Sequence, residues 1–211
     1  MNTDVRPSVA ASWRRIDTWL AAYSPTDLAL LNPPVQPDRL ESLERVLGVP
    51  VPDDLAESLR CHDGAREWST MLPEQSLLSA EAIAERWQML MELAPDFDGF
   101  ETLEGNDEPW WHPLWVPWAE EAGGDPHVLD LRPGADAGRL GWAVHDGCGD
   151  FSDAWPSLAD YMHTVAEALA HGGGVRGRYP YLTPDGRLWW DDGPDCQTLH
   201  GKPLTAAPTF S

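Results

Sequence analysis

Residues 110–118 read WWHPLWVPW, and this tryptophan-rich segment lies where the hydrophobic pattern of the chain changes. Before it, apolar residues recur at the three- and four-residue spacing of amphipathic helices. From it onward, short apolar runs are bounded by Pro, Gly and Asp, which is typical of strands. The sequence therefore predicts a helical first half and a sheet that begins in this segment.

The strand predictions extend from this segment toward the C-terminus. Residues 114–118, 127–131 and 140–144 are predicted to be neighbouring strands of one sheet. A hairpin is predicted from residues 179–182 and 188–190, on either side of a Pro-Asp-Gly turn sequence. The stretch after Gly193 has no hydrophobic period, so we expect it to be irregular.

The helix predictions rest on apolar stripes and on capping residues at the helix ends. The first helix begins at Ser12, whose hydroxyl is placed to accept backbone N–H groups, and continues to Tyr23. Gly48 is expected to end the second helix and Gly172 the last one. The four later helices are predicted at residues 40–47, 53–59, 79–93 and 157–171.

Composition limits the class of protein and the class of partner. The 211 residues include 14 basic and 35 acidic side chains, which gives a formal net charge of −21. This length favours one compact domain with additions. The acidic excess argues against nucleic acid and anionic membranes as direct partners, because phosphate contacts need clustered Lys and Arg. The negative net charge therefore favours a basic protein as the partner.

Cysteine usage and hydropathy indicate a cytoplasmic protein. Cys61, Cys148 and Cys196 are far apart and lack CxxC spacing, so neither a disulfide framework nor a structural zinc site is expected. No apolar run approaches the roughly 20 residues that cross a bilayer. Residues 1–12 lack the apolar stretch of a secretory signal.

The known catalytic motifs are absent from the sequence. It contains no GxSxG elbow, no phosphate-binding GxxxxGK[ST] loop, no GxGxxG after a strand and no HExxH. Three His–Asp pairs have chemistry suited to a metal or acid–base site, but nothing in their spacing brings them together: His62 with Asp63, His127 with Asp130, and His145 with Asp146. We therefore predict no enzyme activity, no catalytic residue, no metal and no cofactor.

The region around the tryptophan-rich segment is strongly acidic. Between Trp87 and Leu131 the sequence has 11 acidic residues and no Lys or Arg, so this block is not neutralised locally. Carboxylates of this kind steer a basic protein toward its binding site, while large aromatic side chains anchor it. The candidate partner-binding residues are Asp107, Glu108, Trp110, Trp111, His112, Trp115, Glu120, Glu121 and Asp125.

Two interpretations of the tryptophans remain open, because side chains alternate between the faces of an extended segment. One face holds Trp111 and Trp115 with two prolines, and the other holds Trp110, His112, Leu114, Val116 and Trp118. In the first interpretation the second set is a core strand and the first set covers an edge or a loop. In the other, exposed indoles rimmed by carboxylates form a protein-docking patch. Both can hold, one for each face.

Several short motifs follow one another in a distinctive order. In the first half they are Trp13, Ile16 and Trp19, residues 37–48, Pro50 and Pro52 before Leu55, and His62, Asp63 and Gly64. In the second half they are Leu77 and Leu78, residues 115–118, 123–125, 128–130 and 141–144, and the helix after Trp155. Over residues 10–170 this order resembles the SMI1/KNR4 (SUKH) superfamily, which leaves residues 171–211 as a C-terminal extension containing the predicted hairpin.

The resemblance implies an α+β domain in which helices pack about a mainly antiparallel central sheet. It also implies a non-catalytic protein, since the family is not known for enzymatic activity. Bacterial members are largely immunity proteins that neutralise polymorphic toxins, and fungal members regulate cell-wall synthesis. Resemblance in fold alone does not identify the binding partner.

Three functions are compatible with these observations. The main expectation is a cytoplasmic immunity protein that neutralises a toxin, such as a basic toxin domain, by stoichiometric binding. The alternative is a regulatory scaffold or adaptor related to the cell-wall regulators. A carbohydrate-acting or metal-dependent enzyme would need two convergent carboxylates, and the sequence offers no such pair to name.

Overall fold

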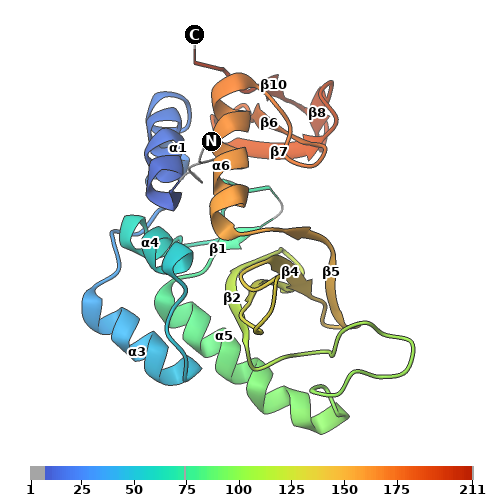
Figure 1. Ribbon diagram of the computed structural model, residues 1–211. Helices are drawn as coiled ribbons and strands as arrows, with labels where there is room; N and C mark the ends of the chain where they lie inside the picture. The colour runs from blue at the N-terminus through green and yellow to red at the C-terminus, as the bar shows by residue number, and fades with distance from the viewer. Residues whose placement is uncertain (1–7, 74, 211) are drawn as a thin grey trace, which may run out of the picture.

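A five-stranded antiparallel sheet organises the fold (Figure 1). The computed structural model describes residues 8–73 and 75–210. The strands lie side by side in chain order: β1 (Ser76–Leu77), β2 (Trp115–Glu120), β3 (Pro126–Asp130), β4 (Leu140–Ala143) and β5 (Gly149–Trp155). Each strand pairs antiparallel with the next. The predicted α+β class with a mainly antiparallel central sheet is confirmed.

The helices precede, interrupt and follow this sheet. They are α1 (Val9–Tyr23), α2 (Pro25–Leu28), α3 (Pro37–Leu47), α4 (Asp53–Cys61), α5 (Ala80–Leu93) with the 3-10 turn η1 (Ala94–Phe97), and α6 (Leu158–His171). Because α5 lies between β1 and β2 in the chain, the short edge strand β1 and its neighbour β2 are joined across a helix. No helix in the described part of the chain is long and apolar enough to cross a membrane.

The predicted helix stops at Gly48 and Gly172 are confirmed, whereas the predicted N-cap of the first helix is not. Ser79 and Ser157 accept hydrogen bonds from the backbone of the first turns of α5 and α6. Gly48 ends α3 in the left-handed conformation, with φ of +70°. The prediction of Ser12 as the first N-cap is wrong, because the Ser8 hydroxyl accepts from Ala11 N at 3.1 Å and the helix begins one turn earlier.

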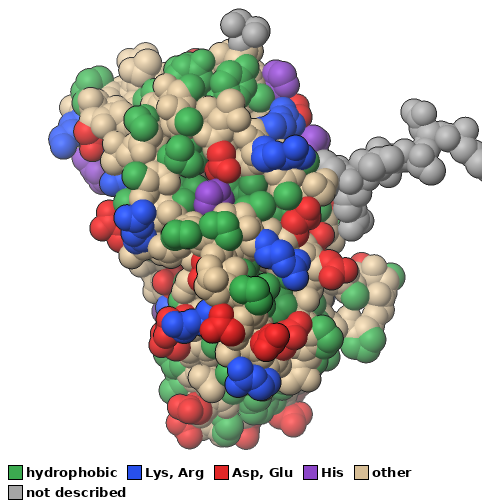
Figure 2. Space-filling view, turned by 90° about the vertical axis from the view of Figure 1, so that its left-hand side faces the viewer, with side chains coloured by type: hydrophobic (Ala, Val, Ile, Leu, Met, Phe, Trp, Pro, Cys, Tyr) green, Lys and Arg blue, Asp and Glu red, His purple; other side chains and the backbone are tan. Residues whose placement is uncertain are grey.

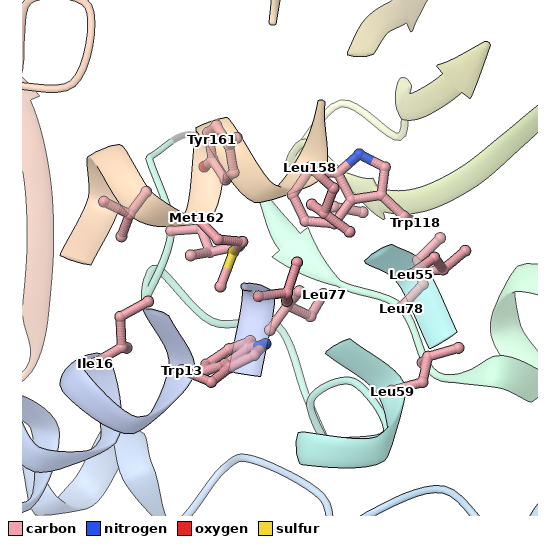
Figure 3. Packing of buried hydrophobic residues seen from close by; sticks show 14 of the residues in the cluster. Trp13, Ile16, Leu55, Leu59, Leu77, Leu78, Trp118, Leu158, Tyr161 and Met162 are labelled. Atoms are coloured by element: carbon pink, nitrogen blue, oxygen red, sulfur yellow. The ribbon is translucent and has the colours of Figure 1, made fainter. Parts of the chain in front are cut away.

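The first face of the sheet forms the main core. Val116 and Trp118 of β2 pack there with Leu129 and Leu140 of the neighbouring strands. Helices α1, α4 and α6 cover this face. Figure 3 shows Trp118 among labelled side chains of three other elements: Leu55 of α4, Leu77 of β1 and Leu158 of α6.

The second face of the sheet carries a separate, smaller core. Trp111 and Trp115 pack there with Leu90 of α5, Ala94 of η1 and Val128 of β3. Residues 115–119 of β2 are buried without interruption. A strand that is covered on both faces has a continuous apolar sequence. This explains why apolar and polar residues do not alternate along β2.

The C-terminal extension packs on the rest of the molecule. Strands β6 (Arg178–Leu182) and β7 (Leu188–Asp192) form an antiparallel hairpin, and Leu188 and Trp190 enter the main core. The prediction of an irregular stretch after Gly193 is partly wrong, because short strands occur there: β8 (Thr198–Leu199), β9 (Lys202–Pro203) and β10 (Thr205–Ala206). Strand β10 pairs with β6, so backbone hydrogen bonds compensate for the missing apolar pattern.

Asp27 of α2 is the charged link between the N-terminal helices and the extension. Its carboxylate is fully buried and accepts hydrogen bonds from Arg187 Nε at 2.8 Å and Leu188 N at 2.6 Å. The Ser24 hydroxyl donates to the same carboxylate at 2.6 Å. A buried carboxylate is tolerated only with such a set of donors.

Replacing Asp27 with Ala is expected to lower the free energy of unfolding by about 3 kcal/mol, because the Leu188 N–H and the Arg187 guanidinium lose their charged acceptor. Urea denaturation measures this change. The matched control is Asp192→Ala, which breaks an exposed ion pair with Arg178 and is expected to cost less than about 1 kcal/mol. Equal losses in the two variants would contradict the assigned role of Asp27.

Candidate protein-binding surface

Two of the predicted docking tryptophans belong to the core. Trp111 and Trp115 are 0% exposed and lie edge to face, with ring centroids 5.9 Å apart. The prediction that they anchor a partner is therefore wrong, as is the prediction that their face covers an edge or a loop. The physical reason is that α5 and η1 cover the second face of the sheet.

The two aromatic residues beside them are only partly accessible. Trp110 lies edge-on to Phe97, with centroids 4.5 Å apart, and donates from Nε1 to the carbonyl of His145 at 3.0 Å. His112 accepts from Leu114 N through Nδ1 at 3.0 Å. Burial and, secondly, the nearby Arg132 lower the pKa of His112, so the ring is neutral at pH 7 and can act as this acceptor.

Glu108 belongs to a four-residue ion-pair network. Arg132 donates to Glu108 Oε2 at 2.6 Å and to Asp130 Oδ2 at 2.6 Å. Arg139 joins the same two carboxylates at 2.9 Å and 3.1 Å and stacks over the Phe151 ring at 4.2 Å. The prediction of a locally unneutralised block is wrong at Glu108 and Asp130, because the two arginines lie later in the sequence but fold back onto them.

The acidic residues after β2 are also engaged within the protein. Glu120 pairs with Arg86 of α5. Asp125 accepts from His145 Nδ1 at 2.7 Å and from His145 N at 2.9 Å, and this side-chain hydrogen bond raises the pKa of His145. Glu121 is half-buried and its N–H donates to the carbonyl of Asp125 at 3.0 Å. Of the predicted docking acids, Asp107 is the one that is exposed.

An exposed apolar patch on α5 and the following loop was not predicted. Met89, Leu93, Phe97 and Leu103 are 39%, 42%, 48% and 56% exposed. Met89 and Leu93 lie one turn apart on α5, and Phe97 is the last residue of η1. The four-residue spacing of Met89, Leu93 and Phe97 could have indicated these exposed residues from the sequence.

Six exposed carboxylates surround this patch along the chain: Glu92, Asp96, Asp98, Glu101, Glu104 and Asp107. None of them forms an ion pair with another residue that the structure describes. We call these ten residues, the four apolar ones and the six carboxylates, the docking face. Figure 2 shows the left-hand side of the molecule in Figure 1, where acidic and basic side chains are interspersed.

The sequence did not predict a site from its three His–Asp pairs, and two of these histidines contact other carboxylates. His62 contacts Asp17 instead, with Nε2 at 3.0 Å from Oδ1, and His145 contacts Asp125. His127 is buried on the first face of the sheet, where burial lowers its pKa to about 3. Within residues 8–73 and 75–210, no group of three His, Cys, Asp or Glu side chains is arranged to hold a metal ion.

The sequence of the chain is similar to those of known proteins. The sequence model described as SMI1 / KNR4 family (SUKH-1) matches residues 34–164. A cell wall biosynthesis/cell cycle regulator smi1 from Schizosaccharomyces pombe is 29% identical over 189 residues, which covers 79% of this chain and 37% of that protein. A glucan synthesis regulatory protein from Neurospora crassa is 24% identical, with 78% and 39% covered. The chain thus spans less than two-fifths of these relatives.

The ion-pair network is expected to affect how the free energy of unfolding depends on pH. Although burial opposes ionisation, hydrogen bonds from Arg132 and Arg139 lower the pKa of Asp130. A carboxylate whose pKa is lower in the folded state stabilises the protein above its unfolded pKa of about 3.9 and loses this effect as pH falls through its folded value. Urea unfolding of Asp130→Asn across this range should therefore show a shallower loss of stability with acid than the unmodified chain.

The matched control for this titration is Asp96→Asn, which removes an exposed carboxylate without an ion-pair partner among the described residues. Its stability should fall with acid as steeply as that of the unmodified chain. If Asp130→Asn shows the same acid dependence as Asp96→Asn, the network does not lower the pKa of Asp130.

Proposed function

The chain belongs to the SMI1/KNR4 family, and we propose that it is a non-catalytic protein-binding module of a regulatory assembly, with the docking face as its contact surface. The observation that carries the proposal is the set of exposed apolar side chains on α5, η1 and the next loop, next in the chain to exposed carboxylates without an ion pair to any residue that the structure describes. The names of the two fungal relatives describe regulators. That function belongs to proteins more than twice as long, so for this chain it is a proposal.

The docking face has the composition of a binding site for a basic protein. Met89, Leu93, Phe97 and Leu103 offer apolar and aromatic groups of the kind that lose contact with water at the centre of an interface. The six carboxylates around them attract a positively charged partner and raise the rate of association. A matching partner surface has apolar side chains at its centre and Lys or Arg at its rim.

Toxin neutralisation is the second candidate and uses the same face. The net charge of −21 supports it, because an acidic chain associates readily with a basic toxin domain. The two functions differ in partner number. A regulatory module is expected to recover several partners from its native cell, whereas an immunity protein has one partner, a toxin encoded beside it. Either function places the protein in the cytoplasm, which we propose as its compartment, without nucleic acid or membrane as a direct partner.

The docking face can be tested with a purified partner identified by affinity capture from the native cell. Phe97→Ser is expected to weaken binding by at least about tenfold, because this exposed side chain is the aromatic one among the four apolar residues of the docking face. Asp96→Lys combined with Glu101→Lys should mainly slow association, and added salt should slow the unmodified pair in the same way. Biolayer interferometry measures the affinity and both rate constants.

Matched controls lie outside the docking face. Trp68→Ser removes a side chain that is 43% exposed, and Asp38→Lys with Glu41→Lys reverses two exposed charges of α3. Both controls should bind like the unmodified chain. The proposal fails if the controls weaken binding as much as the docking-face variants, or if capture recovers only general chaperones.

A further inference from the structure

A mainly apolar groove of about 180 Å³ lies between strand β7 and the loop that joins α4 to β1. Trp68 and Leu72 line it from the loop, and Trp189 and Trp190 line it from β7. Leu72 and Trp190 are buried, whereas Trp68 is 43% exposed and Trp189 is half-buried. Two indoles in this groove are therefore accessible to a ligand.

Hydrogen bonds join the two sides of the groove. The Thr70 hydroxyl of the loop donates to the carbonyl of Leu188 in β7 at 2.5 Å. In the other direction, Trp190 Nε1 donates to the carbonyl of Met71 at 3.1 Å. Because these bonds fix the loop against the strand, the groove is formed before a ligand binds and its ordering costs no binding free energy.

The faces of the two accessible indoles are not covered by other rings. In the described part of the chain, neither Trp68 nor Trp189 stacks against an aromatic ring or a guanidinium group. Trp189 Nε1 donates to Asp191 Oδ2 at 3.0 Å. Trp68 Nε1 forms no hydrogen bond with the residues that the structure describes, so it can donate to a ligand carbonyl.

Acidic side chains outnumber basic ones around the groove. Arg178 lines it, and its charge is balanced by Asp192, with Nη1 at 3.0 Å from Oδ1. Three further acidic residues are chain neighbours of lining residues: Glu67, Glu121 and Asp191. This negative excess attracts a ligand that carries Lys or Arg beside its apolar part.

We propose that this groove binds a proline-rich segment of a second partner protein, with Lys or Arg beside the prolines. The segment lies in the polyproline II conformation, with its rings against Trp68 and Trp189. Proline has no N–H group, so the segment brings few donors that an apolar groove would leave without an acceptor. A polyproline II segment has no internal hydrogen bonds, so its carbonyls are available to Trp68 Nε1. Aromatic-lined grooves bind such segments because little conformational entropy is lost.

Other ligands fit the groove less well. Sites for drug-sized ligands measure roughly 300–1,000 Å³, which is larger than this groove. A single cation would lie beside Arg178, and an anion would be repelled by the surrounding carboxylates. The groove shares no residue with the docking face, so this inference does not rest on the proposed function.

Three synthetic peptides separate the contributions of prolines and charge in the full-length chain. Titration with RPPPPR, blocked at both ends and followed by protein-observed NMR, should show a saturable shift of the Trp68 indole N–H resonance. The peptide RAAAAR keeps the charges without the prolines, and EPPPPE keeps the prolines with reversed charges. Both should bind at least about tenfold more weakly than RPPPPR. No saturable binding of RPPPPR, or equal binding of either control peptide, would overturn the inference.

Variants then locate the binding in the groove. Trp68→Ala and Trp189→Ala should each weaken binding of RPPPPR at least about tenfold, whereas the docking-face variant Phe97→Ser should bind it like the unmodified chain. Trp68 lies in a loop and is largely accessible, so Trp68→Ala is expected to fold, and a circular dichroism melt checks this. The inference fails if folded Trp68→Ala binds as well as Phe97→Ser. It also fails if size-exclusion chromatography shows that the unmodified chain self-associates and Trp68→Ala does not, because the groove then holds a second copy.

Discussion

The burial of β2 on both faces is the constraint on which the rest of the structure depends. Trp118 points into the main core and Trp115 into the second, so one strand supplies the centre of two apolar layers. The close fit is visible at Gly149, where an added Cβ would lie 2.2 Å from the Trp115 ring. Because both faces of this strand must be kept from water, helices α1, α4 and α6 cover one side, with Ala80 and Ile83 from the start of α5, and the C-terminal part of α5 with η1 covers the other.

The position of the docking face follows from this two-sided burial. Leu90 of α5 is buried in the second core. Met89 and Leu93 of the same helix are exposed to solvent. The chain then passes through η1 and a loop rich in carboxylates before it returns to Trp111. The acidic residues that could be neutralised, such as Glu108 and Asp130, lie close to the sheet, where Arg132 and Arg139 reach them. The six carboxylates of the docking face have no ion pair with the described residues and give this face its negative charge.

Local signals in the sequence were sufficient for most elements. The apolar stripe predicted α5, and the runs bounded by Pro, Gly and Asp predicted β2, β3 and β4 to within about two residues. Strand β5 was missed because its sequence, GDFSDAW, has few apolar residues and is held by pairing with β4. The candidate site was predicted less well. Which face of β2 is covered depends on α5, and which carboxylates are neutralised depends on arginines 24 and 31 residues away from Glu108.

The most direct test of this account is hydrogen–deuterium exchange of the full-length chain with and without its purified protein partner. The account predicts that the partner slows exchange in residues 88–107, on the outer side of α5, η1 and the acidic loop. Exchange in β2 should already be slow in the free chain, because this strand is buried on both faces. Protection confined to α1 and α3, or fast exchange of β2 in the free chain, would contradict it.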